Sequence, residues 1–309
     1  MRVALNFQAP TIDAMLQGRM PALELVQVST QGAPDGEVTA LLTPLVGTQT
    51  LDELLPSCQG LKWVHILGTG ADTFPFALAE GIQVSCSKGA SAVAIAEWTL
   101  AMMLCFEKKL PQHWVSEPPA RWFLAELGSL EGKTLGLLGF GAIGQEVARR
   151  AQAFGMRVLA KVRTHRPSPV AGVTFVDSLE QVLREADHLV LALPATAESR
   201  GLLDAELLAH TKPGVHLVNV ARASLIDQEA LRPLLDRGHI AQASLDVVEP
   251  EPLPSSHWLY GHPRVRLSPH VSWSAPGTVD RMLGAFLHNL DAFVSGRPLT
   301  GVVDVAAGY

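Results

Sequence analysis

Three glycines at the spacing Gly-x-Gly-x-x-Gly are the first feature of the sequence that indicates chemistry. Gly139, Gly141 and Gly144 follow the apolar run LGLL and precede a helical pattern that ends near Gly155. Between a strand and a helix, such a loop turns tightly at its first glycine, lets a pyrophosphate approach at its second and packs closely at its third. Glycines used only for turns and packing are the alternative, but the position between strand and helix favours dinucleotide binding.

The end of the next predicted strand bears on which dinucleotide is bound. A carboxylate there would bind the ribose hydroxyls of NAD and repel a 2'-phosphate. The sequence has Val162 and Arg163 instead, followed by Thr164, His165 and Arg166. An arginine pairs with phosphate through bidentate, charge-assisted hydrogen bonds, and a threonine hydroxyl can add another. We therefore predict NADP(H), bound in part by Arg163, Thr164 and Arg166. NAD remains possible, and in the other interpretation these arginines only solvate a loop.

Three later segments supply an arginine, a carboxylate and an imidazole. They are NVARASLID at 219–227, SLDVVEPEPLP at 244–254 and LSPHVSW at 267–273. Each begins near the carboxyl end of a predicted strand, the edge at which open parallel sheets bind ligands. Arg222, Glu251 and His270 can converge there as an anion clamp, an acid and an imidazole. Glu249, two residues before Glu251, is a rival for the role of the acid.

Alternating strand and helix patterns provide the frame for these residues. From Thr134 to about His270, short apolar runs alternate with helical patterns. This alternation predicts a parallel sheet with helices on both faces, a Rossmann-type doubly wound domain of the α/β class. The strand candidates are TLGLLGF, RVLAKV, HLVLALP, VHLVNVA, IAQASLDV and VRLSPH.

A weaker version of the same pattern occupies the first hundred residues and predicts a smaller α/β domain. Its strand candidates are RVALNF, LELVQV, VTALL, LKWVHIL and IQVSC. The tail after Gly296 is too short to fold alone, so we expect it to pack on this first domain. We therefore predict a dinucleotide-binding domain at residues 93–276, inserted in a flavodoxin-like domain made of residues 1–92 and 277–309.

Composition and charge narrow the class of protein. The chain has 309 residues, of which 48% are hydrophobic and 17% charged, enough for two domains with full cores. A net charge of -6 without a basic block argues against nucleic acid as a partner. Cys58, Cys86 and Cys105 are widely spaced, which fits a reducing compartment and predicts no metal site. No signal-peptide pattern or membrane-length apolar stretch is visible, so we expect a cytoplasmic protein that does not enter a membrane.

In their order and spacing, these motifs resemble the D-isomer-specific 2-hydroxyacid dehydrogenases, particularly the NADPH-linked glyoxylate and hydroxypyruvate reductases. The resemblance covers nearly the whole chain and is strongest from Gly89 to Pro276. It implies an oxidoreductase that passes a hydride between NADP(H) and a small 2-oxo or 2-hydroxy acid, with glyoxylate or hydroxypyruvate as the expected substrate. It also implies a homodimer whose smaller domain binds the substrate.

The resemblance implies a role for each member of the catalytic group. Arg222 would bind the substrate carboxylate and polarise the carbonyl. His270 would be the acid in reduction and the base in oxidation. Glu251 would hold the imidazole and favour its protonated form.

Cofactor and substrate contacts follow from the same resemblance. Asp246, at a strand end, would face the nicotinamide carboxamide. Thr69 and Gly70, in the stretch LGTGAD, would donate backbone N–H groups to the substrate carboxylate. The other expected cofactor contacts are Ala142, Ile143, Pro194 and Val220.

Several positions depart from the family pattern. Ala223 replaces a usual glycine, Trp98 replaces a common histidine, and Ser272 with Trp273 replaces a small Ala-Gly pair. Ala223 would tighten the local turn, and Trp98 with Ser272 and Trp273 would add bulk near the substrate pocket, which leaves the substrate open. Two other functions also stay open, namely a nucleotide-sensing interaction protein, as the family's transcriptional corepressors are, and a phosphite- or formate-type dehydrogenase.

Overall fold

The structure of the chain, a computed structural model, describes residues 1–8, 10–28, 33–44, 50–119, 121–123, 125–163 and 167–305. The chain divides into two compact units, a smaller one from Met1–Ser91 and Ala275–Tyr309 and a larger one from Ala92–Ser274. The domain limits expected from the sequence differ from these by one residue at the first crossing and by two at the second.

Within the described residues, the smaller unit has a five-stranded parallel sheet in the order β2-β1-β3-β4-β5. Its strands are β1 (Arg2–Leu5), β2 (Glu24–Gln27), β3 (Ala40–Thr43), β4 (Trp63–Ile66) and β5 (Gln83–Cys86). Its helices are α1 (Pro10–Arg19), α2 (Leu51–Ser57) and α8 (Thr278–Val294), with a short 3₁₀ helix at Phe76–Leu78. The fold is thus of the α/β type that the alternating pattern predicts.

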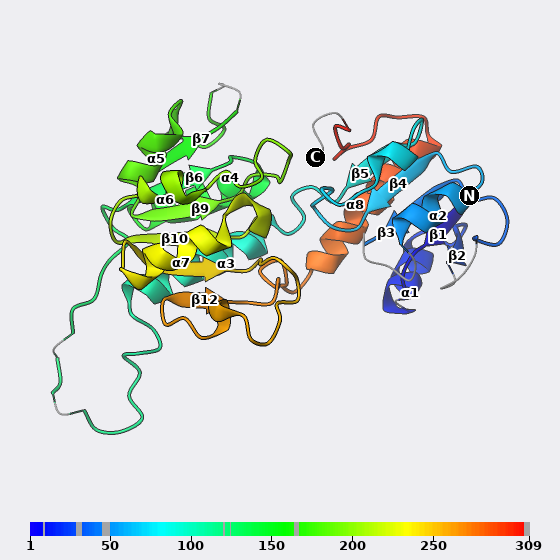
Figure 1. The fold of residues 1–309 in the computed structure, drawn as a ribbon. Coiled ribbons are helices and arrows are strands. Elements are labelled where there is room, and N and C mark those ends of the chain that lie inside the picture. Colours follow the sequence, from blue (N-terminus) through cyan, green and yellow to red (C-terminus); the bar gives the residue numbers. More distant parts are fainter. Residues whose placement is uncertain are drawn as a thin grey trace. The chain divides into compact units, whose positions relative to one another are not determined.

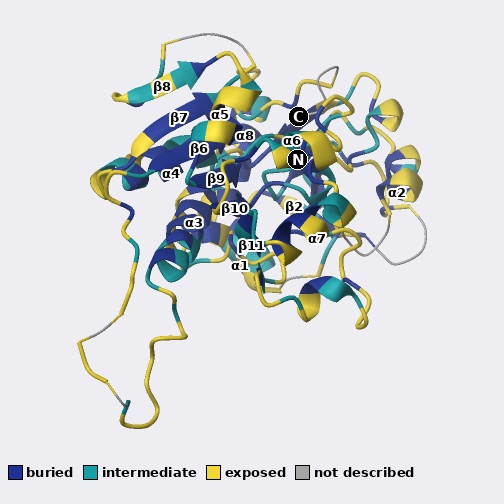
Figure 2. Ribbon diagram, turned by 60° about the vertical axis from the view of Figure 1, so that its left-hand side comes forward, coloured by how far each residue is buried: buried dark blue, intermediate teal, exposed yellow. Residues whose placement is uncertain are grey.

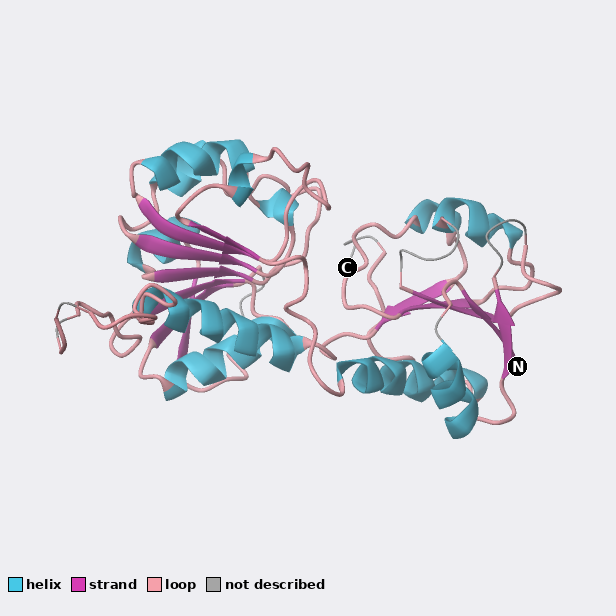
Figure 3. Ribbon diagram, turned by 90° about the horizontal axis from the view of Figure 1, so that it is seen from below, coloured by secondary structure: helices cyan, strands magenta, loops and turns pink. Residues whose placement is uncertain are grey.

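The helices of the smaller unit cover both faces of its sheet (Figure 3). On one face, Leu16 of α1 and Phe286 of α8 pack around the buried Trp63. On the other face, Leu54 of α2 contributes to a second apolar cluster. The C-terminal tail returns to this sheet, because Val302 forms a bridge with Ser85 of β5.

The larger unit contains a seven-stranded parallel sheet, again counted over the described residues, in the order β12-β11-β10-β9-β6-β7-β8. Its strands are β6 (Thr134–Leu138), β7 (Arg157–Lys161), β8 (Val173–Val176), β9 (His188–Leu191), β10 (Val215–Asn219), β11 (Ile240–Leu245) and β12 (Val265–Leu267). Its helices are α3 (Ala92–Glu107), α4 (Ala142–Ala153), α5 (Leu179–Glu185), α6 (Ala205–Ala209) and α7 (Gln228–Asp236), with 3₁₀ turns at Ala223–Leu225 and Trp258–Tyr260.

Helices also lie on both faces of the larger sheet (Figures 1 and 3). Leu100 of α3 and Val147 of α4 belong to the core on one face, and Val182 of α5, Leu208 of α6 and Leu231 of α7 to the core on the other. The order of the strands reverses at β6, which pairs with β7 on one side and β9 on the other. This is the predicted doubly wound arrangement, and its ligand site is expected at the carboxyl ends of the strands beside β6.

The segment between α3 and β6 stands out by its exposure (Figure 2). It extends from the larger unit and carries the exposed side chains of Trp114, Val115, Trp122, Phe123 and Leu127. Over the part of the chain that the structure describes, no helix is long and apolar enough to cross a membrane. The same residues include no group of three His, Cys, Asp or Glu side chains suited to a metal ion.

Candidate active site

The glycine loop joins β6 to α4, and its geometry explains two of its three glycines. Gly139 has a φ of +95°, and a Cβ added to it would lie 2.6 Å from the carbonyl oxygen of Ala192. A Cβ on Gly144 would lie 2.6 Å from the carbonyl oxygen of Gly139. Only glycine fits either position, because a side chain would collide with the backbone. These contacts hold the loop closely against the neighbouring strand end.

Gly141 differs from its two neighbours, because packing within the protein does not require it. A Cβ added to Gly141 would meet no protein atom within 4 Å. Gly141 is the residue that caps α4, and Ala142 and Ile143 are in the first turn of that helix. Free space at a helix N-terminus, with its unpaired N–H groups and positive dipole end, suits a pyrophosphate. The loop therefore fits a dinucleotide.

Backbone hydrogen bonds bring the ends of three neighbouring strands together at this loop. The N–H of Gly139 donates to the carbonyl of Lys161 at 3.1 Å, and that of Ala192 donates to Leu138 at 2.8 Å. Arg163, which is exposed, follows the end of β7 by two residues and is therefore close to the glycine loop. Thr164 and Arg166 lie outside the described residues, so their contacts with the cofactor stay a prediction.

Arg222 stands just beyond β10, on a turn that Asn219 closes. The side-chain oxygen of Asn219 accepts from the N–H of Ala221 at 3.0 Å, and its amide nitrogen donates to the carbonyl of Arg222 at 2.8 Å. The Arg222 guanidinium donates to the carbonyl of Ala221 at 2.7 Å and is half-buried. Asn and Asp side chains commonly close such turns through the backbone two residues on. The Asn219 turn was missed in the sequence, although Asn-Val-Ala-Arg carries that signal.

His270 and Glu251 are in direct contact. The Nδ1 atom of His270 lies 2.9 Å from Oε2 of Glu251, and their side chains are 44% and 38% exposed. The other carboxylate oxygen of Glu251 accepts from the N–H of Val248 at 2.9 Å. Glu251 is therefore held at both oxygens, and its contact occupies the Nδ1 atom of His270, so Nε2 is the nitrogen expected to act on a substrate.

Glu249, the rival carboxylate, points elsewhere. Its Oε1 lies 3.6 Å from Arg200 Nη1, and both side chains are largely exposed. Its backbone is held by Gln228, whose amide donates to the Glu249 carbonyl at 2.7 Å. The geometry thus separates two carboxylates that the sequence left as alternatives, and it gives the imidazole contact to Glu251.

Asp246 holds the loop that carries His270. The buried carboxylate accepts hydrogen bonds from the hydroxyl of Ser268, from the N–H of Val271 at 2.9 Å and from the N–H of Ser272 at 3.0 Å. The backbone carbonyl of Asp246 also accepts from the N–H of His270 at 2.9 Å. Both carboxylate oxygens thus bind the loop, a role that the sequence did not reveal. The expected contact with a nicotinamide carboxamide stays a prediction.

The remaining predicted site residues fall at strand ends of both units. Pro194, after β9, is exposed, and its carbonyl accepts from the Ser199 hydroxyl at 2.9 Å. Val220 is buried directly after β10. Thr69 and Gly70 follow β4 in the smaller unit, where the Thr69 carbonyl lies 3.7 Å from the Cys86 sulfur. The predicted role of Thr69 and Gly70 in binding the substrate carboxylate stays a prediction.

Trp98 is partly buried, and its side chain packs against the apolar core between α3, α4 and the larger sheet. Its expected effect on the substrate pocket stays a prediction. Of the three departures from the family pattern, Ala223 and the pair Ser272 and Trp273 lie in the loops that carry Arg222 and His270.

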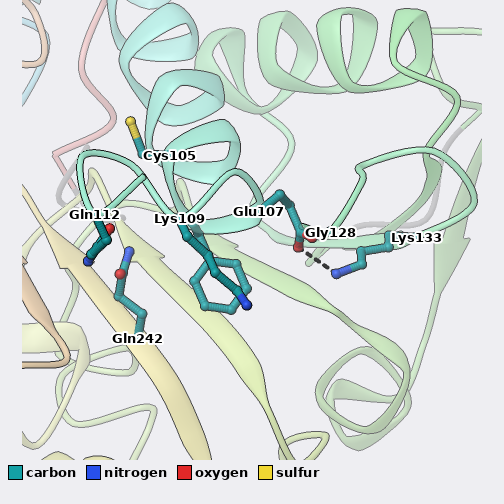
Figure 4. Close-up of a pocket in the computed structure, with 8 residues that line it drawn as sticks. Cys105, Glu107, Lys109, Gln112, Gly128, Lys133 and Gln242 are labelled. Carbon is teal, nitrogen blue, oxygen red and sulfur yellow. Dashed lines mark hydrogen bonds and ion pairs between the residues drawn. The ribbon is translucent and has the colours of Figure 1, made fainter. Parts of the chain in front are cut away.

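A cavity of about 460 Å³ lies in the larger unit, near the amino ends of its strands and away from the glycine loop (Figure 4). Beside it, Glu107 forms an ion pair with Lys133 and contacts Nε2 of His188 at 3.0 Å. His188 in turn contacts His216 at 3.1 Å, and burial lowers the pKa of both histidines. These groups surround the amino ends of β6, β9 and β10. The cluster lies at the other end of the strands from the glycine loop, so it is not part of the candidate active site.

Comparisons with known proteins agree with this geometry. Residues 100–272 match the family model described as D-isomer specific 2-hydroxyacid dehydrogenase, NAD binding domain. A D-3-phosphoglycerate dehydrogenase of Bacillus subtilis (strain 168) is 35% identical over 293 residues, which cover 92% of this chain and 55% of that protein. The glyoxylate/hydroxypyruvate reductase A of Serratia proteamaculans (strain 568) is 31% identical over 268 residues, covering 83% of this chain and 84% of the reductase.

A solved structure extends the similarity to the whole chain. It is an NADPH-dependent glyoxylate/hydroxypyruvate reductase from Sinorhizobium meliloti in complex with NADP and sulfate. Its TM-score is 0.84 at 26% identity, and the match covers 100% of this chain and 99% of that one. The chain therefore spans only about half of the phosphoglycerate dehydrogenase but nearly all of this reductase.

Proposed function

We propose that this chain, which belongs to the family of D-isomer-specific 2-hydroxyacid dehydrogenases, reduces a small 2-oxo acid to the 2-hydroxy acid with NADPH. The observation that carries the proposal is the contact of His270 with Glu251, at the same edge of the sheet as Arg222 and the glycine loop. Glyoxylate and hydroxypyruvate are the substrates that we favour, because relatives of similar length are named for them.

Each side chain has a chemical task in this proposal. Bound NADPH supplies the hydride that reaches C2 of the substrate. Arg222 would bind the substrate carboxylate through paired, charge-assisted hydrogen bonds and polarise the adjacent carbonyl. His270 would donate a proton to the carbonyl oxygen as negative charge develops there. Glu251, at 2.9 Å from the imidazole, would favour the protonated form that reduction needs.

Turnover of candidate substrates is the direct test of this function. NADPH oxidation should be measured with glyoxylate and hydroxypyruvate, and NAD⁺ or NADP⁺ reduction with 3-phosphoglycerate. We expect turnover of at least one 2-oxo acid with NADPH. Selective oxidation of 3-phosphoglycerate would instead favour the activity named for the Bacillus relative. If neither reaction exceeds the blank, the proposal is wrong and an interaction protein becomes the better interpretation.

A change at Arg163 should reveal the preference for NADPH. Arg163→Ala is expected to raise the Michaelis constant for NADPH about 10- to 100-fold and to leave that for NADH nearly unchanged, because only NADPH offers the 2'-phosphate. The measurement is the Michaelis constant for each cofactor at saturating 2-oxo acid. Arg149→Ala is a matched control, since Arg149 lies on α4 and pairs there with Glu146. Equal effects on both cofactors would count against the assignment.

Replacement of Glu251 should change the pH dependence of reduction. Glu251→Gln keeps the size of the side chain but removes the negative charge that lies 2.9 Å from the imidazole of His270. The alkaline limb of kcat/KM for the 2-oxo acid is therefore expected to move to lower pH. Glu249→Gln is the control, because Glu249 faces Arg200 and should leave the limb in place. A shift in the Glu249→Gln control alone would show that Glu249, and not Glu251, has this role.

The proposal also includes a homodimer in the cytoplasm. The exposed apolar side chains of Trp114, Val115, Trp122, Phe123 and Leu127 support a second copy as the partner of this segment, because large apolar side chains left exposed favour burial against a partner. Cys58, Cys86 and Cys105 are free thiols, which supports a reducing compartment.

A further inference from the structure

The backbone of His270 has a conformation that few residues adopt. Its φ is +54°, in the left-handed region, where an ordinary side chain crowds the following carbonyl. Such a conformation persists only where the surrounding structure determines it, and it concentrates at functional sites. The question is therefore which contacts keep this peptide in place.

The amino side of the His270 peptide is held by β11 and the residues after it. The N–H of His270 donates to the backbone carbonyl of Asp246, whose carboxylate binds the N–H groups of Val271 and Ser272. Asp246 itself is buried, so these contacts anchor the loop to the sheet. They involve N–H groups only and leave the carbonyl of His270 to another donor.

That donor is the indole of Trp273. Its Nε1–H donates to the His270 carbonyl at 2.9 Å. The ring is 38% exposed, so burial alone does not hold it in its position. A tryptophan three residues after His270 can thus close the turn from the solvent side, which neither of the small residues expected there could do.

We propose that Trp273 is a positioning residue for His270. Its hydrogen bond fixes the His270 carbonyl, which keeps the peptide in the left-handed conformation and the imidazole at contact distance from Glu251. Without the bond, rotation of this peptide would carry the imidazole away from the carboxylate. Among the described residues, the carboxylates that contact this segment are Glu251, which contacts the imidazole, and Asp246, which binds backbone N–H groups.

This inference rests on the proposed function for its kinetic consequences. Trp273→Phe keeps an aromatic ring and removes the donor. We expect kcat for the 2-oxo acid to fall about fivefold to tenfold, the usual effect of one neutral hydrogen bond, with an unchanged Michaelis constant for NADPH. The alkaline limb of reduction should also move to lower pH, as the contact with Glu251 loosens. Trp258→Phe is the control, because it removes another indole donor, which bonds Glu229 at 3.1 Å.

A double-mutant cycle separates positioning from general damage. In a Glu251→Gln background, Trp273→Phe should move the alkaline limb little further, because both changes act on one contact. Additive shifts would overturn the proposal. A fall in kcat with an unmoved limb, accompanied by a lower melting temperature, would reduce Trp273 to a structural role. Wild-type kinetics in Trp273→Phe would also overturn it.

The imidazole can also be followed without any substrate. The ring signals of His270, assigned by their loss in His270→Ala, are titrated by NMR in the full chain and in Trp273→Phe. A titration midpoint that moves down in the variant supports positioning, and an unmoved midpoint refutes it. This result holds even if no 2-oxo acid is turned over, so failure of the proposed function and failure of this inference are distinguishable.

Discussion

His270→Ala is expected to lower kcat for 2-oxo acid reduction by about 10²- to 10⁴-fold, the usual contribution of a positioned proton donor. The hydride leaves negative charge on the substrate oxygen, and alanine offers no proton to neutralise it. The glycine loop is untouched, so the dissociation constant for NADPH should not change. The measurements are steady-state kcat and NADPH fluorescence titration.

A histidine far along the chain provides the control for this change. His288 is exposed on α8 of the smaller unit, and His288→Ala should keep wild-type kcat. If His270→Ala retained more than a tenth of the wild-type kcat, proton donation would have to come from another group. A parallel loss of NADPH binding would indicate a damaged fold instead.

Arg222→Gln is expected to lower kcat/KM for the 2-oxo acid by about 10²- to 10³-fold, because the substrate carboxylate loses its charged, bidentate partner. The amide of glutamine can still form one hydrogen bond, but it has neither the charge nor the fork of a guanidinium. Arg222→Lys restores the charge without the fork, so it should recover only part of the loss. The measurement is kcat/KM at saturating NADPH.

The effect of Arg222→Gln should be confined to the substrate. NADPH affinity is expected to stay at the wild-type value, and so is the activity of Arg200→Gln, a control on an exposed arginine that lies beside Glu249. An Arg222→Gln enzyme with an unchanged Michaelis constant for the 2-oxo acid would show that the carboxylate is bound elsewhere.

The sequence predicted the fold well because a buried parallel strand needs an almost wholly apolar run. In the described larger sheet, the five interior strands each have at least three buried residues. The exceptions are the two edge strands, β12, where only Val265 is buried, and β8 (Val173–Val176), where only Val176 is buried and which the sequence did not reveal. An edge strand has one neighbour and open solvent on the other side, so its residues need not be apolar. Nothing in VTFV separated it from a turn.

The sequence predicted some parts of the candidate site and not others. Apart from one local turn, the parts that it missed depend on contacts between residues far apart in the sequence or on the path of a loop. The glycine loop is local, so its spacing alone indicates it. The turn at Asn219 is equally local, but its signal was missed. Glu249 and Glu251 have the same chemistry two residues apart, and only the path of their loop distinguishes them. The three hydrogen bonds of the Asp246 carboxylate join the end of β11 to residues more than twenty positions later, which no local pattern reveals.

The divided smaller unit has a consequence for the order in which the chain is made. Strands β1 to β5 leave the ribosome before the larger unit, but α8, which covers one face of their sheet, leaves it after that unit. Trp63 stacks on Phe286 and Phe293 at 5.4 Å, so these contacts cannot form until the whole larger unit has been made. The larger unit is continuous from Ala92 to Ser274 and can close its core earlier. The larger unit can therefore complete its fold before the smaller unit receives α8.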